Sequence, residues 1–214
     1  GDQYGYTLTR GTEEFREVCA QWYKDRFGVI LNPETEVLPL MGSQDGLAHI
    51  FLAYINPGDL ALIPDPGYPI YSAGLWLAGG KKAALPLLEE NGFLPDLSKI
   101  DPGLARQAKL MFLNYPNNPT AAVASLRFFE EVVEFALKYN ILICHDAAYS
   151  ELAFEGFKPV SFLQAQSAKD VGIEFHSVSK TYNLAGGRLG FVVGNPRVIE
   201  TLSRLKSNID YGVF

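Results

Sequence analysis

Cysteine is scarce in this chain of 214 residues, and its two cysteines, Cys19 and Cys144, lie far apart in apolar segments. They form no CxxC pair, so we expect neither a disulfide framework nor a thiolate metal site. Buried free thiols are typical of a reducing compartment. We therefore expect the protein in the cytoplasm.

Histidine motifs for metal binding and long apolar runs are also missing. The three histidines show no HExxH-like spacing, and no apolar stretch reaches the ~20 residues that a membrane-spanning helix needs. The net charge of -6 comes without a basic stripe, so binding to nucleic acid or to an anionic membrane has no electrostatic support. Chemistry on a small molecule, without a metal, is the favoured class of function.

The sequence does contain an alternation of short apolar strands and helices. Because there is no internal repeat or linker, this order predicts a single α/β domain whose mostly parallel sheet carries helices on both faces. The strands are expected at residues 36–41, 60–64, 109–113, 141–144, 171–178 and 189–193, and the helices at 12–27, 47–56, 125–139 and 197–207.

Two of these helices have a well-defined apolar face, which is more typical of core packing than of a binding surface. The first is expected to begin after Thr12, to stop at Gly28, and to turn inward Phe15, Val18, Cys19, Trp22, Tyr23 and Phe27. The inward side chains of the helix at 125–139 are expected to be Leu126, Phe129, Val132, Val133, Ala136 and Leu137.

The segment SVSKT, residues 177–181, places an amine where a buried strand gives way to a loop. A lysine such as Lys180 can form a Schiff base with a carbonyl once burial or a nearby cation frees its amine. Ser177, Ser179 and Arg188 could together bind a phosphate, because hydroxyls and a guanidinium both donate to its oxygens. On its own, however, a lysine after a strand is more often simply solvated.

Two further turns carry side chains suited to a phosphorylated ring. The loop at 42–46 leads into a helix, so its amide groups, with Ser43 and Gln44, could hold an anion; a plain N-cap is the equal alternative. Tyr68 stands between two prolines in a rigid turn. It could stack on a planar ring or only seal the turn.

His145 and Asp146 directly follow the apolar strand at 141–144, at its carboxyl end. Ligands of open α/β sheets bind outside the carboxyl ends of the strands. A carboxylate at that position could pair with a heterocyclic N–H⁺ and keep it protonated. His145 is interpreted as a structural residue.

Taken in order, these residues stand in motifs that cover essentially the whole chain: GSQDG (42–46), PDPGYPIY (64–71), NYPNNPT (114–120), HDAAYSEL (145–152) and SVSKTYNLAGGRLGFVVGN (177–195). The chain therefore resembles the class I/II pyridoxal-phosphate aminotransferases of the aspartate aminotransferase fold. Within that family the sequence of these motifs is most similar to that of the LL-diaminopimelate aminotransferases and their neighbours.

The resemblance implies a role for each matching position. Lys180 would hold pyridoxal 5'-phosphate as a Schiff base and then move a proton at the substrate α-carbon, and Asp146 would bind the pyridine nitrogen. Asn118 and Tyr149 would bind the ring 3-oxygen, and Tyr68 would stack on the ring. The phosphate would be held by Ser43, Gln44, Ser177 and Arg188, joined by Tyr6 of a neighbouring subunit, with Tyr4 as the other candidate.

The implied protein is a homodimeric aminotransferase that acts on an L-amino acid and a 2-oxo acid. Residues 1–214 would be its large cofactor-binding domain, a fragment that lacks the small domain and its carboxylate-binding arginine. Ala121 and Gly187 depart from the usual glycine and tryptophan at their positions, and Gly187 would loosen the loop around Arg188. Two alternatives stay open: a C–S β-lyase on the same fold, and a cofactor-binding or dimerising domain without turnover.

Overall fold

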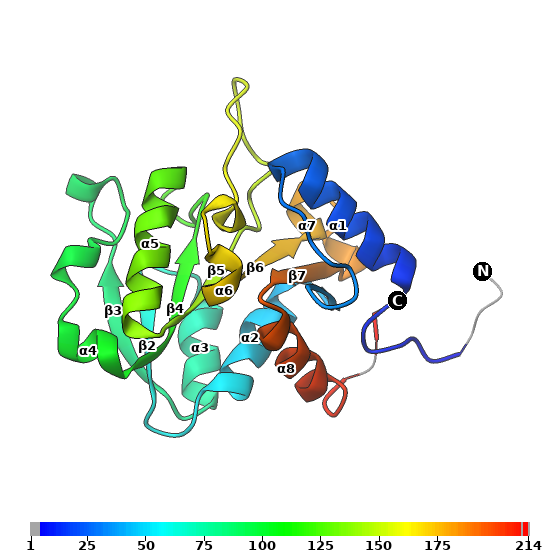
Figure 1. Ribbon diagram of the computed structural model, residues 1–214, viewed down its shortest axis with the longest axis horizontal. Coiled ribbons are helices and arrows are strands. Elements are labelled where there is room, and N and C mark those ends of the chain that lie inside the picture. The colour runs from blue at the N-terminus through cyan, green and yellow to red at the C-terminus, as the bar shows by residue number, and fades with distance from the viewer. Residues whose placement is uncertain (1–4, 211, 214) are drawn as a thin grey trace.

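The computed structural model describes residues 5–210, 212 and 213, in which strands and helices alternate (Figure 1). The strands are β1 (Val37–Leu40), β2 (Leu60–Asp65), β3 (Lys81–Pro86), β4 (Ala108–Asn114), β5 (Leu142–Asp146), β6 (Gly172–Ser177) and β7 (Gly190–Gly194). The helices are α1 (Glu13–Phe27), α2 (Ser43–Tyr54), α3 (Pro69–Leu77), α4 (Pro102–Gln107), α5 (Leu126–Tyr139), α6 (Ala168–Val171), α7 (Val178–Thr181) and α8 (Pro196–Lys206).

All seven strands form one sheet in the order β1-β7-β6-β5-β4-β2-β3. Strands β2 to β6 pair in parallel, whereas β7 is antiparallel to both of its neighbours, β1 and β6. The carboxyl ends of β4, β5 and β6 therefore meet at one edge of the sheet. The expectation of a mostly parallel α/β sheet is confirmed.

Two apolar clusters cover the two faces of the sheet. On one face, side chains of α1 and α5, such as Tyr23 and Phe129, pack against alternate residues of the strands. On the other, α2, α3 and α8 contribute Phe51, Tyr71 and Leu202. Parallel sheets need this cover because both of their faces are apolar. Figure 1 shows the helices distributed over both sides.

Helix α1 follows its sequence signals at both ends. The Thr12 hydroxyl accepts the N–H of Phe15, and Gly28 ends the helix with a φ of 69°. Two side chains that were expected to point into the core do not do so. Val18 of α1 is 62% exposed, and Leu137 of α5 is 55% exposed. Both lie at the margin of their apolar stripes, where a step of about 100° per residue turns the side chain past the core.

Several elements differ from the sequence expectation. Helix α2 begins at Ser43 and so includes the segment that was expected to be a loop, and the strand expected to reach Val178 ends at Ser177, where α7 begins. No element was expected at α3, β3 or α4. Strand β3 is an edge strand with an exposed face, so it lacks the apolar run by which the other strands were recognised.

A buried hydrogen-bond network joins α1 to the strands that carry the site. The Glu174 carboxylate accepts bonds from the Tyr23 hydroxyl (2.6 Å), the Ser161 hydroxyl (2.6 Å) and the Phe162 N–H (2.8 Å). His145 Nδ1 lies 2.7 Å from Glu174 Oε2, the oxygen that also accepts the Phe162 N–H. Burial alone would raise the pKa of Glu174, but the bonds from His145 and His176 hold that pKa well below its usual range. His145 is thus part of the core.

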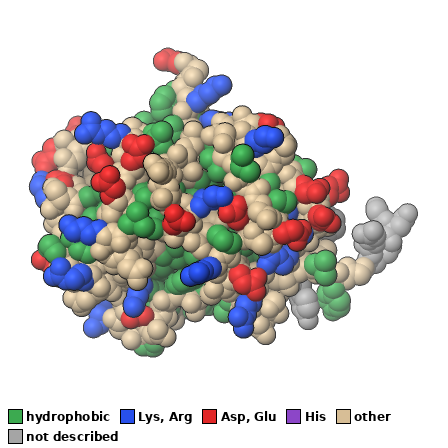
Figure 2. Space-filling model, viewed as in Figure 1, with side chains coloured by type: hydrophobic (Ala, Val, Ile, Leu, Met, Phe, Trp, Pro, Cys, Tyr) green, Lys and Arg blue, Asp and Glu red, His purple; other side chains and the backbone are tan. Residues whose placement is uncertain are grey.

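The surface gives two further observations. On the face shown in Figure 2, basic and acidic side chains are interspersed, without a continuous basic stripe. In the part of the chain that the structure describes, no helix combines the length and the apolar character needed to cross a membrane.

Candidate active site

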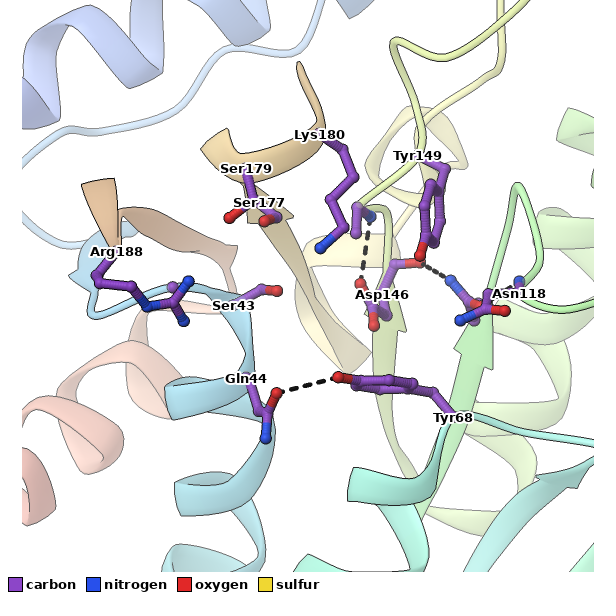
Figure 3. A pocket seen from close by; sticks show the side chains of 13 residues that line it. Ser43, Gln44, Tyr68, Asn118, Asp146, Tyr149, Ser177, Ser179, Lys180 and Arg188 are labelled. Atoms are coloured by element: carbon purple, nitrogen blue, oxygen red, sulfur yellow. Dashed lines mark hydrogen bonds between the residues drawn. The ribbon is translucent and has the colours of Figure 1, made fainter. Parts of the chain in front are cut away.

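A cavity of about 130 Å³ lies at the carboxyl ends of β4, β5 and β6 (Figure 3). It brings together residues from segments that are far apart in the sequence. The lining residues are Gly42, Ser43, Gln44, Tyr68, Asn114, Asn118, Asp146, Ala148, Tyr149, Ser177, Ser179, Lys180 and Arg188. Among the residues proposed from sequence, Tyr6 is absent from this lining.

Lys180 enters the cavity from α7, directly after the buried strand β6. The strand fixes the backbone, and the single turn of α7 carries the lysine to the rim, where the residue is exposed. In Figure 3 its amine points toward the space between Asp146 and Ser43, and the Tyr68 ring lies on the other side of that space. The amine is therefore accessible to a small molecule in the cavity.

Asp146 is the last residue of β5 and lies on the side of the cavity away from Arg188 (Figure 3). It is only 5% exposed. Its carboxylate accepts a hydrogen bond from the Tyr71 hydroxyl at 2.8 Å and one from the Ala148 N–H at 3.2 Å. Burial raises the pKa of Asp146, although the bond from Tyr71 opposes the shift. A carboxylate made more basic in this way binds a proton on a ligand nitrogen more strongly.

Two residues that hold Asp146 were not singled out in the sequence. Tyr71 is the last residue of PDPGYPIY and is fully buried, and Asn114 opens NYPNNPT. The Asn114 amide donates to the backbone oxygen of Asp146 at 2.8 Å, and its own oxygen accepts the Asn118 N–H at 2.8 Å. Their positions inside the motifs were the available signal, but periodicity alone gives no reason to choose them.

The floor of the cavity is formed by Tyr68, which is the residue just before α3. Its hydroxyl donates to Gln44 Oε1 at 3.0 Å, so the ring is fixed at both ends. This bond leaves the Gln44 amide N–H groups available to a ligand. Tyr149 faces the same space, and burial together with the charge of Asp146 raises the pKa of its hydroxyl.

The remaining end of the cavity is suited to an anion. Ser43 is the first residue of α2, and no side chain caps this end of the helix. The N–H groups of Gly42 and Asp45 bond to backbone oxygens of Leu40 and Gly42, so the N–H groups of Ser43 and Gln44 and the Ser43 hydroxyl are the donors offered to a ligand. Arg188 donates to the Ala185 oxygen at 2.9 Å. A Cβ at Gly42, whose φ is 77°, would lie 2.7 Å from Arg188 Nη2, so only glycine lets the guanidinium approach the turn.

The two residues that depart from the resemblance, Ala121 and Gly187, differ in how well they suit their surroundings. Ala121 has a φ of 60°, a conformation that favours the glycine usual at that position. At Gly187 a Cβ would lie 2.9 Å from the Leu184 side chain.

Tyr6 is 85% exposed, and Tyr4 lies outside the described residues.

Comparison with known proteins identifies related chains. The family model described as "Aminotransferase class I and II" matches residues 1–210. The chain is 56% identical over 213 residues to an LL-diaminopimelate aminotransferase of Moorella thermoacetica, covering 100% of this chain and 55% of the relative. It is 54% identical over 211 residues to an LL-diaminopimelate aminotransferase of Halothermothrix orenii, covering 99% and 54%.

Solved structures show the same fold. Substrate-bound BacF of Bacillus subtilis has a TM-score of 0.96 and 46% identity, covering 99% of this chain and 53% of that one. A probable N-succinyldiaminopimelate aminotransferase of Thermus thermophilus has a TM-score of 0.94 and 43% identity, covering 99% and 56%. The chain spans about half the length of the relatives that it matches.

Proposed function

Because this chain belongs to the class I and II aminotransferases, whose cofactor is pyridoxal 5'-phosphate, we propose that it transfers an amino group between an L-amino acid and a 2-oxo acid. The observation that supports this proposal is the cavity shared by the Lys180 amine, the buried Asp146 carboxylate and the anion-binding end at Ser43 and Arg188. An aldehyde, a basic ring nitrogen and a phosphate on one planar ring match these three groups.

Nine of the lining residues have a proposed task. The Lys180 amine would hold the cofactor by its aldehyde and, when free, would move the proton at the substrate α-carbon. Asp146 keeps the ring nitrogen protonated, Asn118 and Tyr149 bind the ring 3-oxygen, and Tyr68 stacks on the ring. The residues that hold the phosphate are Ser43, Gln44, Ser177 and Arg188.

When bound, the cofactor supplies an electron sink for the bonds at the substrate α-carbon. The protein's contribution is to orient those bonds and to protonate or deprotonate the right atom. Asp146 serves the sink, because a protonated ring nitrogen draws electrons more strongly than a neutral one. Lys180 serves the proton transfer, since its amine is free for this task once substrate has displaced it. The amino group thus moves in two half-reactions.

For the substrate we propose an amino acid of the diaminopimelate class, with LL-diaminopimelate as the first compound to assay. The support is the activity for which the relatives are named, since they are LL-diaminopimelate aminotransferases at 52–56% identity. Amino transfer to 2-oxoglutarate would support this substrate. Release of pyruvate from cystathionine would support the C–S β-lyase instead, because both reactions use the same cofactor site.

The test of cofactor attachment is borohydride reduction followed by mapping of the labelled residue. We expect the label on Lys180, and we expect Lys180→Ala to lose the visible absorption band of the bound cofactor. Lys99→Ala, at a lysine whose side chain is 68% exposed and outside the cavity lining, is the control and should keep both. A label on another lysine would contradict the proposal. A correct label without amino transfer would favour the domain that binds cofactor but lacks turnover.

We also propose that the protein is a homodimer, that Tyr6 contacts the phosphate in the partner subunit, and that residues 1–214 are the large domain. The exposure of Tyr6 and its absence from the cavity of its own chain support the second point. Sedimentation with and without cofactor tests the assembly. The proposed compartment is the cytoplasm, since both cysteines are free and buried.

A further inference from the structure

A buried lysine lies behind the anion-binding end of the cavity. Lys206, near the end of α8, is 2% exposed. Its ammonium donates to Asp45 Oδ2 at 2.5 Å and to Asp210 Oδ2 at 2.7 Å. Lysine is almost never fully buried unless it is paired, so this position requires both carboxylates. No motif or spacing in the sequence singles out Lys206.

Asp45 connects this lysine to the turn that begins α2. It stands two residues after Ser43, in the first turn of the helix, and its Oδ2 also accepts the N–H of Met41 at 2.9 Å. Its other oxygen lies 2.8 Å from His49 Nδ1. Burial alone would raise the pKa of Asp45, but the contacts with His49 and Lys206 outweigh it and lower the pKa to about 2. The Asp45 side chain thus closes the turn: Asp45 follows Gln44 in the chain, and its carboxylate bonds to Met41, the residue before Gly42.

The charge of Asp45 poses an electrostatic problem for an anion site. A carboxylate in the first turn of α2 stands beside the amides at which a phosphate would bind, and like charges repel. Lys206, which Asp45 shares with Asp210, offsets part of this charge, and Lys206 does not line the cavity. Because the pair is largely out of water, solvent screens the interaction little.

A metal ion explains the cluster less well. Ligand atoms of Asp45, His49 and Asp210 lie within 4.8 Å of one another. The Lys206 ammonium, however, already contacts two of these three residues. A cation would have to displace a buried positive charge.

We propose that Lys206 is a positioning residue for the phosphate end of the cofactor cavity. It offsets the negative charge of Asp45 and, through Asp45, holds the turn at Gly42, Ser43 and Gln44 in its binding geometry. This inference rests on the proposed function. It concerns a residue that acts through Asp45 and does not itself line the cavity.

The experiment compares two ligands that differ only in the phosphate. Dissociation constants of pyridoxal 5'-phosphate and of pyridoxal are measured on the cofactor-free full chain for wild type, Lys206→Met and the double variant Lys206→Met/Asp45→Asn. We expect Lys206→Met to weaken pyridoxal 5'-phosphate about tenfold, in line with the loss of a charge-assisted contact, and to leave pyridoxal nearly unchanged. The double variant should recover part of the loss, because it also removes the uncancelled carboxylate.

Lys169→Met is the matched control, because Lys169 pairs with Glu36 at 2.9 Å and neither residue lines the cavity; it should alter neither constant. Hydrogen exchange of the Met41 amide, the donor to Asp45, gives a readout that is independent of the cofactor. We expect this exchange to accelerate in Lys206→Met. Thermal melting checks that each variant is folded.

The outcomes separate the two proposals. Equal weakening of both ligands, or an unchanged ratio of their constants, would show that Lys206 has only a structural role and would overturn this inference alone. Failure of wild type to bind either ligand would overturn the proposed function and this inference with it. If Lys206→Met does not fold, Asp45→Asn provides the test, because it removes the negative charge and leaves the Lys206 ammonium in place: a selective gain in affinity for the phosphorylated ligand supports the inference, and an unchanged ratio or a selective loss refutes it.

Discussion

At the scale of single residues, the burial of the Asp146 carboxylate lowers the stability of the cofactor-free protein. Its carboxylate is buried and its pKa is raised by that burial. A folded state with the higher pKa binds the proton more tightly than the unfolded state, so stability falls as the pH rises above the unfolded value. Functional sites often retain such unfavourable groups.

We therefore predict that Asp146→Asn stabilises the cofactor-free protein at pH 7 and that the gain shrinks toward pH 4. Asparagine carries no charge; its single oxygen can accept the Ala148 N–H, and its NH2 group can donate to the oxygen of the Tyr71 hydroxyl, which bonds to the other carboxylate oxygen of Asp146. Urea unfolding at the two pH values measures the difference. Asp25→Asn, at an exposed position of α1, should change little. Asp146→Asn with the same or lower stability at pH 7 would contradict the electrostatic argument.

At the scale of elements, the closest approach in the site is between β7 and the start of α2. A Cβ at Gly190 would lie 2.7 Å from the Ser43 nitrogen, 2.7 Å from the His176 oxygen and 2.9 Å from the Gly42 carbonyl carbon. These are backbone atoms, which cannot move aside as a flexible side chain can. The missing side chain at Gly190 is what allows the anion-binding turn to sit against the sheet.

We predict that Gly190→Ala displaces this turn. Overpacking of this kind costs about 1–3 kcal/mol of unfolding free energy, and the affinity for pyridoxal 5'-phosphate should fall with it. Chemical denaturation and a cofactor titration measure the two effects. Gly186→Ala, where a Cβ meets nothing within 4 Å, is the control and should leave stability nearly unchanged. Unaltered affinity in Gly190→Ala would show that the turn tolerates the shift.

The network around Glu174 acts at the same scale. It fastens α1 to β5 and β6, the strands whose ends carry Asp146 and Ser177. A buried charge is tolerated only when it is fully hydrogen-bonded. These bonds therefore help to hold α1 against the two strands that carry the site.

At the scale of the whole molecule, one sheet separates two cores. Ile143 on β5 belongs to the core beneath α1 and α5, and Ile50 on α2 belongs to the core on the other face. Both side chains are fully buried. Because the same strands support both faces, loss of one core removes the support of the other.

We predict a single cooperative unfolding transition that both cores control. Ile50→Val and Ile143→Val should each cost about 0.5–1.5 kcal/mol, and the double variant should show roughly the sum, since sites on opposite faces share no partner. Urea unfolding followed by fluorescence and by circular dichroism measures this. Ile30→Val, at a residue 74% exposed, is the control. Two separate transitions would show that the faces unfold independently.

The sequence alone determined the features that depend on short stretches of chain. Apolar runs marked six of the seven strands, Thr12 and Gly28 marked the ends of α1, and ordered motifs indicated the family and ten of the residues that line the cavity. These signals are local, because strand and helix periodicity and capping act within a few residues.

Only the tertiary structure decided which distant groups touch. It joined Tyr71 to Asp146, Tyr68 to Gln44, and Lys206 to Asp45 across 161 positions, and it set β7 antiparallel between β1 and β6. It also turned Val18 and Leu137 toward solvent. Contacts of this kind depend on the path of the whole chain and on what covers each face, and no local pattern encodes that path.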